Sequence, residues 1–514
     1  MAQVSAASAS QPVEHSKRLF WGCFIALVAT SFGFIARVLT AGDWGAEFGL
    51  SETQIGEILG AGLWPFAISI ILFSLVIDYI GYKAAMWFGL ICHTLSTVLI
   101  VMANDYWMMY VGTFVLALGS GTVEAYINPV VATVFSKQKT KWLNILHAGW
   151  PGGLVLGGIL AIALGADLYW KWKIAIILLP TVVYAVMLFG ERFPMHERVA
   201  AGVSYRDMLR EVGAVGALII AAMVVMELGR IFGLSLGIEI LLIALVTGGY
   251  AYYTRSLGRP LFILFLLIMM PLATTELGVD SWITEFMAGE MGRLGLAAGW
   301  VLVYTSAIMM VLRFFAGPIV ERMTPLGLLA ASAALASIGL FALSAATGAT
   351  ILLAATLYGV GKTFFWPTTL GVVAEQFPKG GALTLNAVAG VGLLAVGIVG
   401  APFLGYVQDR AIDGNLFTTA PVLHEQVMEP KMGLFGEYEA LDLNAVETAT
   451  PEERQLIDDV QERSTKDALR TVAVLPILML AFYIGLILYF RGKGGYKPVE
   501  LAERKEAEDA AAPV

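Results

Sequence analysis

The sequence predicts an all-α polytopic membrane protein with about 14 transmembrane helices. Hydrophobic runs of about 20 residues, the length that crosses the apolar core of a bilayer, recur along the whole chain. Of its 514 residues, 58% are hydrophobic and 14% are charged, a balance that a soluble domain of this length could not bury. The loops between the runs also alternate in charge with a fixed phase, as expected for two sides of a membrane.

The first run, 19–41, follows a polar segment that includes Lys17 and Arg18. It is longer than the core of a signal peptide and lacks a small-residue cleavage site, so we expect a retained span. The expected spans are 19–41, 57–77, 84–103, 107–135, 143–165, 172–190, 213–229, 235–253, 260–287, 298–317, 326–346, 349–375, 382–406 and 469–490.

Basic residues concentrate in the connections on the side of the N-terminus. Those connections carry Lys83, Lys137, Lys139, Lys141, Arg192, Arg198, Arg206, Arg210, Arg255, Arg259, Arg322, Lys379, Arg491, Lys493 and Lys497. The opposite short loops hold only Lys171, Lys173, Arg230 and Arg293. By the positive-inside rule both termini are expected in the cytoplasm, which requires an even number of spans. This predicts a multi-pass protein of the plasma membrane, the bacterial inner membrane.

The net charge of −8 belongs to one segment. Between Asp409 and Asp467 there are 14 acidic and 5 basic residues, so the rest of the chain is close to neutral. The acidity therefore says nothing about nucleic acid, which we do not expect as a partner. Cys23 and Cys92 both lie in apolar runs and offer neither a disulfide framework nor a cysteine metal site.

Two segments of the chain resemble each other. Gly121 to Pro129 matches Gly359 to Pro367, and aligning the prolines places Glu124 opposite Lys362. Internal repeats around a central site are typical of alternating-access carriers. The expected organisation is a cytoplasmic segment 1–18, a six-helix bundle 19–192, a linker with two inserted helices 193–259, a second six-helix bundle 260–492 that includes an external loop 409–467, and a cytoplasmic tail 493–514.

The loop between the second and third spans resembles the G-x-x-x-D-x-x-G-R-K pattern of the major facilitator superfamily. It retains Asp78, Gly81 and Lys83, with Ser74 and Tyr82 as departures. A second copy, at the equivalent loop of the second half, contains Gly317, Glu321 and Arg322. The resemblance implies a major facilitator-type fold of two six-helix bundles plus the inserted pair. It also implies that these six retained residues form conformational latches.

Within that superfamily, Gly119 to Pro129 followed by Leu143 to His147 resembles the fucose:proton symporter family. That family carries a membrane-embedded Glu just ahead of Asn-Pro in its fourth span, which corresponds to Glu124 and Asn128 here. The resemblance implies sugar transport with Glu124 as the proton-coupling residue. The acidic residue of the family's first span is absent, and the charged residue of that span is Arg37.

Ionisable side chains inside a bilayer are costly, so each needs a partner or a function. Burial disfavours the charged form of a carboxyl, which suits Glu124 for proton transfer or for hydrogen bonds to sugar hydroxyls. A buried ion pair of Glu124 with Lys362 or Arg37 is the alternative. Lys362 could neutralise Glu124, bind an anionic substrate group, or extend toward the membrane surface.

Arg37 and Glu276 occupy equivalent places in the first span of each half. Arg37 is always charged and could clamp substrate or pair with Glu276. His147 and Trp150 share one helix face, which suits sugar recognition. The predicted substrate and charge network is Arg37, Glu276, Lys362, Asn128, His147, Trp150, Asp280, Trp282 and Trp366, although Trp282 also fits an interfacial aromatic belt.

The long external loop contains a strong helix start. Thr450 is an N-cap, Pro451 follows at N1, and Glu453 completes a capping box. The loop could act as a lid, as a partner surface or as an inert insertion. The tail after Lys497 is rich in Ala, Glu and Lys and predicts a frayed helix or disorder.

These observations predict a secondary active transporter that moves a small polar solute, a sugar, by alternating access with proton symport. An organic-anion carrier that uses Arg37 and Lys362, and a membrane sensor without transport, are the alternatives. No nucleophile motif, zinc spacing or phosphate loop is present, so we expect no enzyme, no metal and no cofactor. The expected partners are substrate, protons and the bilayer, with the protein a monomer.

Overall fold

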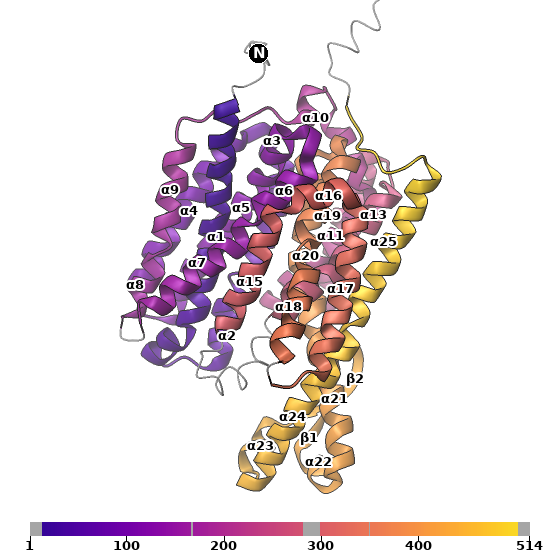
Figure 1. Ribbon diagram of the computed structural model, residues 1–514. Coiled ribbons are helices and arrows are strands. Elements are labelled where there is room, and N and C mark those ends of the chain that lie inside the picture. Colours follow the sequence, from indigo (N-terminus) through magenta and orange to yellow (C-terminus); the bar gives the residue numbers. More distant parts are fainter. Residues whose placement is uncertain (1–12, 166–167, 281–298, 349, 502–514) are drawn as a thin grey trace, which may run out of the picture.

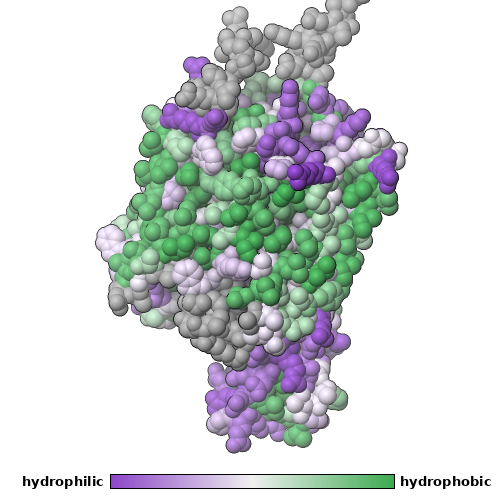
Figure 2. All heavy atoms as spheres, in the orientation of Figure 1, coloured by the Kyte–Doolittle hydropathy of each residue, from purple (hydrophilic) through white to green (hydrophobic). Residues whose placement is uncertain are grey.

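The computed structural model describes residues 13–165, 168–280, 299–348 and 350–501. Long helices form one bundle, and a small domain projects from the end opposite the start of α1 (Figure 1). The outer surface of the bundle is a broad hydrophobic band, while hydrophilic residues gather at the end that carries the start of α1 and on the projecting domain (Figure 2). This distribution is the one expected of a bundle immersed in lipid.

The N-terminal half lies on the left of Figure 1, in indigo to magenta. Three of its spans are broken, the second into α2 and α3, the fifth into α6 and α7, and the sixth into α8 and α9. Its elements are α1 (Val13–Phe48), α2 (Glu52–Gly60), α3 (Trp64–Ile80), α4 (Tyr82–Met102), α5 (Tyr106–Val134), η1 (Ser136–Gln138), α6 (Lys139–His147), α7 (Gly149–Ala163), α8 (Trp170–Ala175) and α9 (Leu178–Leu188).

The C-terminal half lies on the right, in pink through orange to yellow (Figure 1). Two π-helical turns, η2 and η4, interrupt its first and fifth spans. Its membrane elements are α13 (Pro260–Ala273), η2 (Thr274–Gly278), α15 (Gly299–Phe314), α16 (Ala316–Met323), α17 (Pro325–Ala345), α18 (Thr350–Lys362), α19 (Phe365–Gln376), η3 (Pro378–Gly380), α20 (Gly381–Ala395), η4 (Val396–Gly400), α21 (Ala401–Thr419), α24 (Pro451–Val472) and α25 (Val474–Gly492).

Within the described residues, 12 helices are long and apolar enough to cross a membrane. The bent pair α15 and α16 raises that number to 13. The expected span 349–375 corresponds to α18 and α19, which are 13 and 12 residues long and separated by Thr363 and Phe364. The prediction of about 14 spans is therefore confirmed in its main outline. The start of α1 and the end of α25 lie at the same end of the bundle (Figure 1).

The inserted pair consists of α11 (Tyr205–Phe232) and α12 (Leu236–Thr254), which follow the short α10 (Glu197–Ala200). α11 packs against α13 and α20, whereas α12 packs mainly on α11. None of the apolar window of α12 is buried inside the protein, so this helix faces lipid along its length. The pair thus lies at the periphery of the bundle, with α11 between α12 and the rest of the protein.

The segment 409–467, expected to be an external loop, folds into a small domain. Between α21 and α24 it contains α22 (Pro421–Val427), the antiparallel strands β1 (Met428–Gly433) and β2 (Gly436–Leu441), and α23 (Leu443–Thr448). Its own core is formed by Ile412, Leu416, Leu423, Val427, Leu441, Ile457 and Val460. The two membrane helices extend into this domain, so the expected spans 382–406 and 469–490 are shorter than the helices themselves.

The predicted helix start in this domain is confirmed. Thr450 Oγ1 accepts a hydrogen bond from the Glu453 N–H at 3.3 Å, and Glu453 Oε2 accepts one from the Thr450 N–H at 2.8 Å. We predict that Thr450→Ala destabilises the start of α24 by about 1 kcal/mol, the usual cost of removing an N-cap. Amide hydrogen exchange should then rise in residues 451–457 and stay unchanged in β1 and β2. Equal protection in both proteins would contradict this.

Candidate transport site

Three prolines free backbone carbonyls inside the bundle. In an α-helix the carbonyl of residue i−4 accepts from the N–H of residue i, which proline lacks. Pro129, Pro151 and Pro367 therefore release the carbonyls of Ala125, His147 and Thr363. Each released carbonyl accepts a hydrogen bond from a side chain instead. Asn386 Nδ2 donates to Ala125 O at 3.0 Å. Arg313 donates to the other two, from Nη1 to His147 O at 2.9 Å and from Nε to Thr363 O at 2.7 Å.

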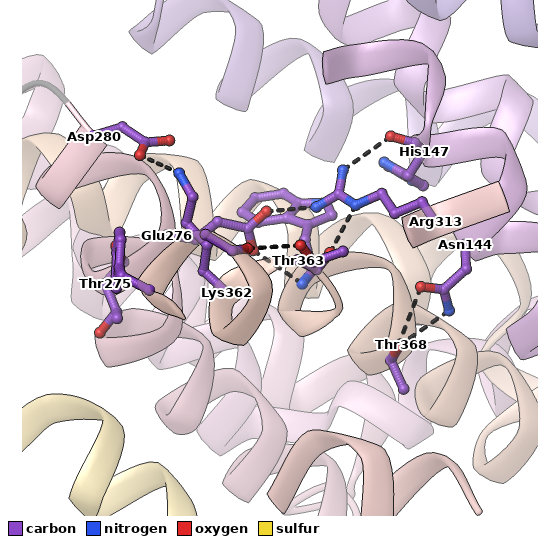
Figure 3. A network of polar contacts seen from close by, with 12 residues as sticks. Asn144, His147, Thr275, Glu276, Asp280, Arg313, Lys362, Thr363 and Thr368 are labelled. Atoms are coloured by element: carbon purple, nitrogen blue, oxygen red, sulfur yellow. Dashed lines mark hydrogen bonds and ion pairs between the residues drawn. The ribbon is translucent and has the colours of Figure 1, made fainter. Parts of the chain in front are cut away.

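Arg313 on α15 is the centre of this arrangement (Figure 3). Its third contact is an ion pair between Nη2 and Glu276 Oε1 at 2.7 Å, and both side chains are buried. The planar guanidinium thus joins two broken spans of opposite halves and the π-helical turn η2 that carries Glu276. A lysine could not make these three contacts at once, because its single ammonium group lacks the fork geometry.

Glu276 also bonds the start of α19 in the same half. Its Oε2 accepts a hydrogen bond from the backbone N–H of Trp366 at 3.0 Å. Nearby, the fully buried ammonium of Lys362 forms an ion pair with Asp280 (Figure 3). Lys362 also lies over the ring of Tyr358, at 5.4 Å from its centroid. Four residues of the predicted network, Glu276, Asp280, Lys362 and Trp366, are therefore brought together.

A chain of hydrogen bonds leads from Arg313 into the N-terminal half. Asn128 Nδ2 donates to Glu124 Oε2 at 2.7 Å, and His147 Nε2 lies 2.9 Å from Asn128 Oδ1. The carbonyl of the same His147 accepts from Arg313. Glu124, Asn128, His147, Arg313 and Glu276 are all buried. They form one continuous polar connection between a carboxyl of each half, which we call the cross-half chain.

Gly119 and Gly121 serve helix packing around this chain. A Cβ at Gly121 would lie 2.3 Å from the carbonyl oxygen of Phe66, and one at Gly119 would lie 2.7 Å from Cys92 Cβ. The glycines therefore let α5 approach α3 and α4 closely. This close packing supports the position of Glu124 on α5.

The remaining network residues lie on the N-terminal half. The half-buried Trp150 packs between Phe34 and Phe66, with ring centroids 6.0 and 6.4 Å away. Arg37 is buried, and its Nε donates to the Gly33 carbonyl at 2.9 Å. Trp282 lies outside the described residues.

The charge pairs differ from those considered from sequence. Glu124 pairs with neither Lys362 nor Arg37, and Arg37 does not pair with Glu276. Instead, Lys362 forms an ion pair with Asp280, and Arg313 forms one with Glu276. Sequence reasoning missed the role of Arg313. The signal that could have found it is a cation inside the apolar run 298–317.

The two halves meet tightly toward the end of the bundle where α1 begins. Glu375 Oε1 at the end of α19 accepts from the N–H and the hydroxyl of Thr140, at 3.1 and 2.5 Å. Deeper in the bundle, Asn144 Nδ2 donates to Thr368 Oγ1 at 3.1 Å (Figure 3). The segment after α25 folds onto the same place, since Tyr496 donates to Glu375 Oε2 at 2.7 Å. The structure is therefore closed at this end.

Three of the six predicted latch residues have a structural role, and the other three are exposed. The carboxylate of Asp78 forms an ion pair with Arg198 of α10, and Gly81 adopts a φ of 80° that favours glycine between α3 and α4. Gly317 packs against the stem of Lys141. Lys83, Glu321 and Arg322 are exposed and have no ion-pair partner in the described part of the chain.

The connector between the halves is fixed by α10. Glu197 Oε2 lies 2.5 Å from Lys139 Nζ, next to the Arg198 ion pair. His196 precedes α10, and its Nδ1 accepts from the Arg198 N–H at 3.0 Å. Burial lowers the pKa of His196 to about 4, so this cap is neutral and persists at physiological pH.

We predict that Thr140→Val opens the closed end more often. The change removes the 2.5 Å hydrogen bond to Glu375 at nearly constant volume. Because a bond to a charged group contributes about 1.5–3 kcal/mol, labelling of a cysteine at the buried position Ala132 by a polar maleimide should be at least about tenfold faster. Thr133→Val, which loses only a bond within its own helix, is the control. Equal rates in the two variants would contradict the role of Thr140.

Comparison with known proteins identifies the fold. The family model of the Major Facilitator Superfamily matches residues 21–402. The chain belongs to this superfamily of membrane transporters. The expected membership and the two-bundle architecture are thereby confirmed.

Several solved structures of the Major Facilitator Superfamily share this fold. A proton:xylose symporter bound to 6-bromo-6-deoxy-D-glucose is 13% identical, with a TM-score of 0.60 and coverage of 92% of this chain and 96% of that one. The fucose:proton symporter of E. coli is 16% identical, with a TM-score of 0.54 and coverage of 91% and 98%. The human organic anion transporter MFSD10 is 13% identical, with a TM-score of 0.58 and coverage of 92% and 100%.

A gentisate transporter of Corynebacterium glutamicum is 24% identical over 141 residues. The match covers 27% of this chain and spans about a third, 32%, of that transporter. At these identities the solved structures establish the fold alone.

Proposed function

We propose that this chain is a secondary active transporter that moves a small polar solute across the plasma membrane by alternating access with proton symport. The observation that carries the proposal is the cross-half chain. Two rigid halves that rotate against each other must break the Arg313 contact to the His147 carbonyl. A change of charge at either end of the cross-half chain, at Glu124 or at Glu276, therefore changes the free energy of the rotation of the halves.

Glu124 is the proposed proton-coupling residue. Its carboxyl is buried and bonded to the Asn128 amide, and none of the described cations lies within ion-pair distance of it. A buried carboxyl without a counter-charge favours the protonated form. Its deprotonation would place a negative charge at one end of the cross-half chain, and proton binding would remove it.

The first candidate solute is a sugar. Phe34, Trp150 and Phe66 form an aromatic group, and Trp150 follows His147, which bonds Asn128, by three residues. Aromatic rings together with amide and imidazole groups are the combination that recognises a hydroxylated ring. The fold-level similarity to the proton:xylose and fucose:proton symporters supports this candidate.

The second candidate is a small organic anion. The observation in its favour is Arg37, because its buried guanidinium has no carboxylate partner in the described structure and its Nη1 has no hydrogen-bond partner. The partial match to a gentisate transporter and the fold shared with an organic anion transporter support this candidate. Lys362 is less suited to the role, because Asp280 already neutralises it.

Uptake into proteoliposomes tests the proposed function. Labelled neutral sugars, sugar acids and hydroxybenzoates are offered with and without an inward proton gradient. We expect at least one of them to accumulate only with the gradient, and the gain should disappear when a protonophore is added. Entry that is identical under both conditions for every solute would contradict proton symport.

A further inference from the structure

Arg37 differs from every other buried cation in the described structure. Six cationic side chains are buried: Arg37, Lys139, Lys173, Arg198, Arg313 and Lys362. Five of them lie within 3.9 Å of a carboxylate oxygen. Arg37 has only the Gly33 carbonyl as a partner, and its Nη1 makes no hydrogen bond. A buried guanidinium remains charged, so the absence of an anion leaves a large desolvation cost unbalanced.

The guanidinium lies against the break between α2 and α3. A Cβ at Gly62 would lie 2.0 Å from Arg37 Nη1, so the side chain rests directly on the backbone at this glycine. The break precedes α3, a helix of 17 residues whose start has no side-chain cap. The N–H groups of Trp64 and Phe66 donate to no carbonyl in the preceding segment. The positive end of the α3 dipole and the free Nη1 are therefore both located at this break.

Aromatic side chains lie near this break, on α1, on α7 and at the start of α3. Phe34 lies one turn before Arg37 on α1 and packs on Trp150, which packs on Phe66 at the start of α3. Trp64 contacts Phe114 at a centroid distance of 5.4 Å. Trp150 also follows His147 of the cross-half chain by three residues. His147 bonds Asn128, which bonds the proposed coupling residue Glu124, so Trp150 connects the aromatic group to the cross-half chain along the sequence.

From these observations we infer that Arg37 and the N-terminal end of α3 form an anion subsite that binds the carboxylate of the transported solute. The inference rests on the proposed function, because it names the charge of the solute that the transporter moves. A ring carried by that solute would lie against Phe34, Trp150 and Phe66. The positive charge of Arg37 would also attract a free inorganic anion. The experiment therefore distinguishes a carboxylate from chloride and phosphate.

Equilibrium binding to the purified full-length protein provides the test, since it needs no gradient. Labelled sugar acid and hydroxybenzoate are measured against wild-type protein and Arg37→Gln, with chloride and phosphate as competing anions and the matching neutral sugar as a further competitor. We expect saturable binding of a carboxylate that weakens at least about tenfold in Arg37→Gln, the loss expected for one bond to a charged group. Carboxylate binding of equal strength in both proteins would overturn the inference, as would displacement by chloride or phosphate at equal concentration.

Two further variants keep the test decisive where Arg37→Gln fails to fold. Gly62→Ala displaces the guanidinium but keeps its charge, whereas Gly60→Ala adds a methyl group with no atom within 4 Å. We expect weaker carboxylate binding in Gly62→Ala only, and equal binding in both alanine variants would overturn the inference. If carboxylate binding depends on Arg37 but no solute is taken up with the proton gradient, the proposed function is refuted and the anion subsite is not. Gradient-driven uptake restricted to neutral sugars would refute the anion subsite alone.

Discussion

Glu124→Gln is expected to abolish accumulation of solute against its gradient while exchange of labelled for unlabelled solute continues. Glutamine retains the shape of a protonated carboxyl and can still accept from Asn128 Nδ2, which is 2.7 Å away in the wild type. It cannot release a proton, so the inward proton gradient no longer drives the conformational cycle. The measurement compares gradient-driven uptake and equilibrium exchange in the same proteoliposomes.

Glu227→Gln is the matched control for this change. Glu227 is also a buried carboxylate inside the membrane-spanning part, but it lies on the inserted helix α11 and pairs with Arg230 at 2.6 Å. Its substitution should leave coupling intact. A Glu124→Gln protein that still accumulates solute like the wild type would remove Glu124 from the coupling mechanism.

Arg313→Met is expected to lower stability by about 3–5 kcal/mol, the usual cost of leaving one member of a buried ion pair without its partner. The change leaves Glu276 Oε1 and the carbonyls of His147 and Thr363 without their donor. It should also abolish transport, because the contact between the halves is lost. Thermal unfolding in detergent and uptake in proteoliposomes measure the two effects.

Arg313→Lys keeps the positive charge but removes the fork geometry of the guanidinium, so it tests which of the two matters. If the three-way fork matters, lysine should recover part of the stability but not transport, since one ammonium cannot reach all three acceptors. Arg410→Met is the control, because Arg410 on α21 is exposed and has no ion-pair partner in the described residues. Full transport by Arg313→Lys would contradict a role for the fork geometry.

Much of the fold was predictable from the sequence because a membrane imposes simple rules. Apolar runs, basic loops and the repeat that aligns Pro129 with Pro367 led to two bundles and an inserted pair. The projecting domain was predicted less well. Its helix start at Thr450 follows from a local capping pattern, but the hairpin of β1 and β2 depends on packing in a small core that only the folded chain brings together.

The candidate site shows the same division. Charged and polar residues in apolar runs are conspicuous, so Glu124, Glu276 and Lys362 were found from sequence. Their partners were not, because pairing depends on helix rotation and on where each span breaks. Pro151 and Pro367 create the carbonyl acceptors that attract Arg313, and only the three-dimensional arrangement shows that one arginine reaches both.

The central claim is that proton binding at Glu124 is coupled to solute movement through the cross-half chain. The most direct measurement is the internal pH of proteoliposomes, without any initial gradient, after solute is added outside. The account predicts acidification of the interior by wild-type protein and none by Glu124→Gln, although solute still enters through both. Solute entry through wild-type protein without any change of internal pH would contradict it.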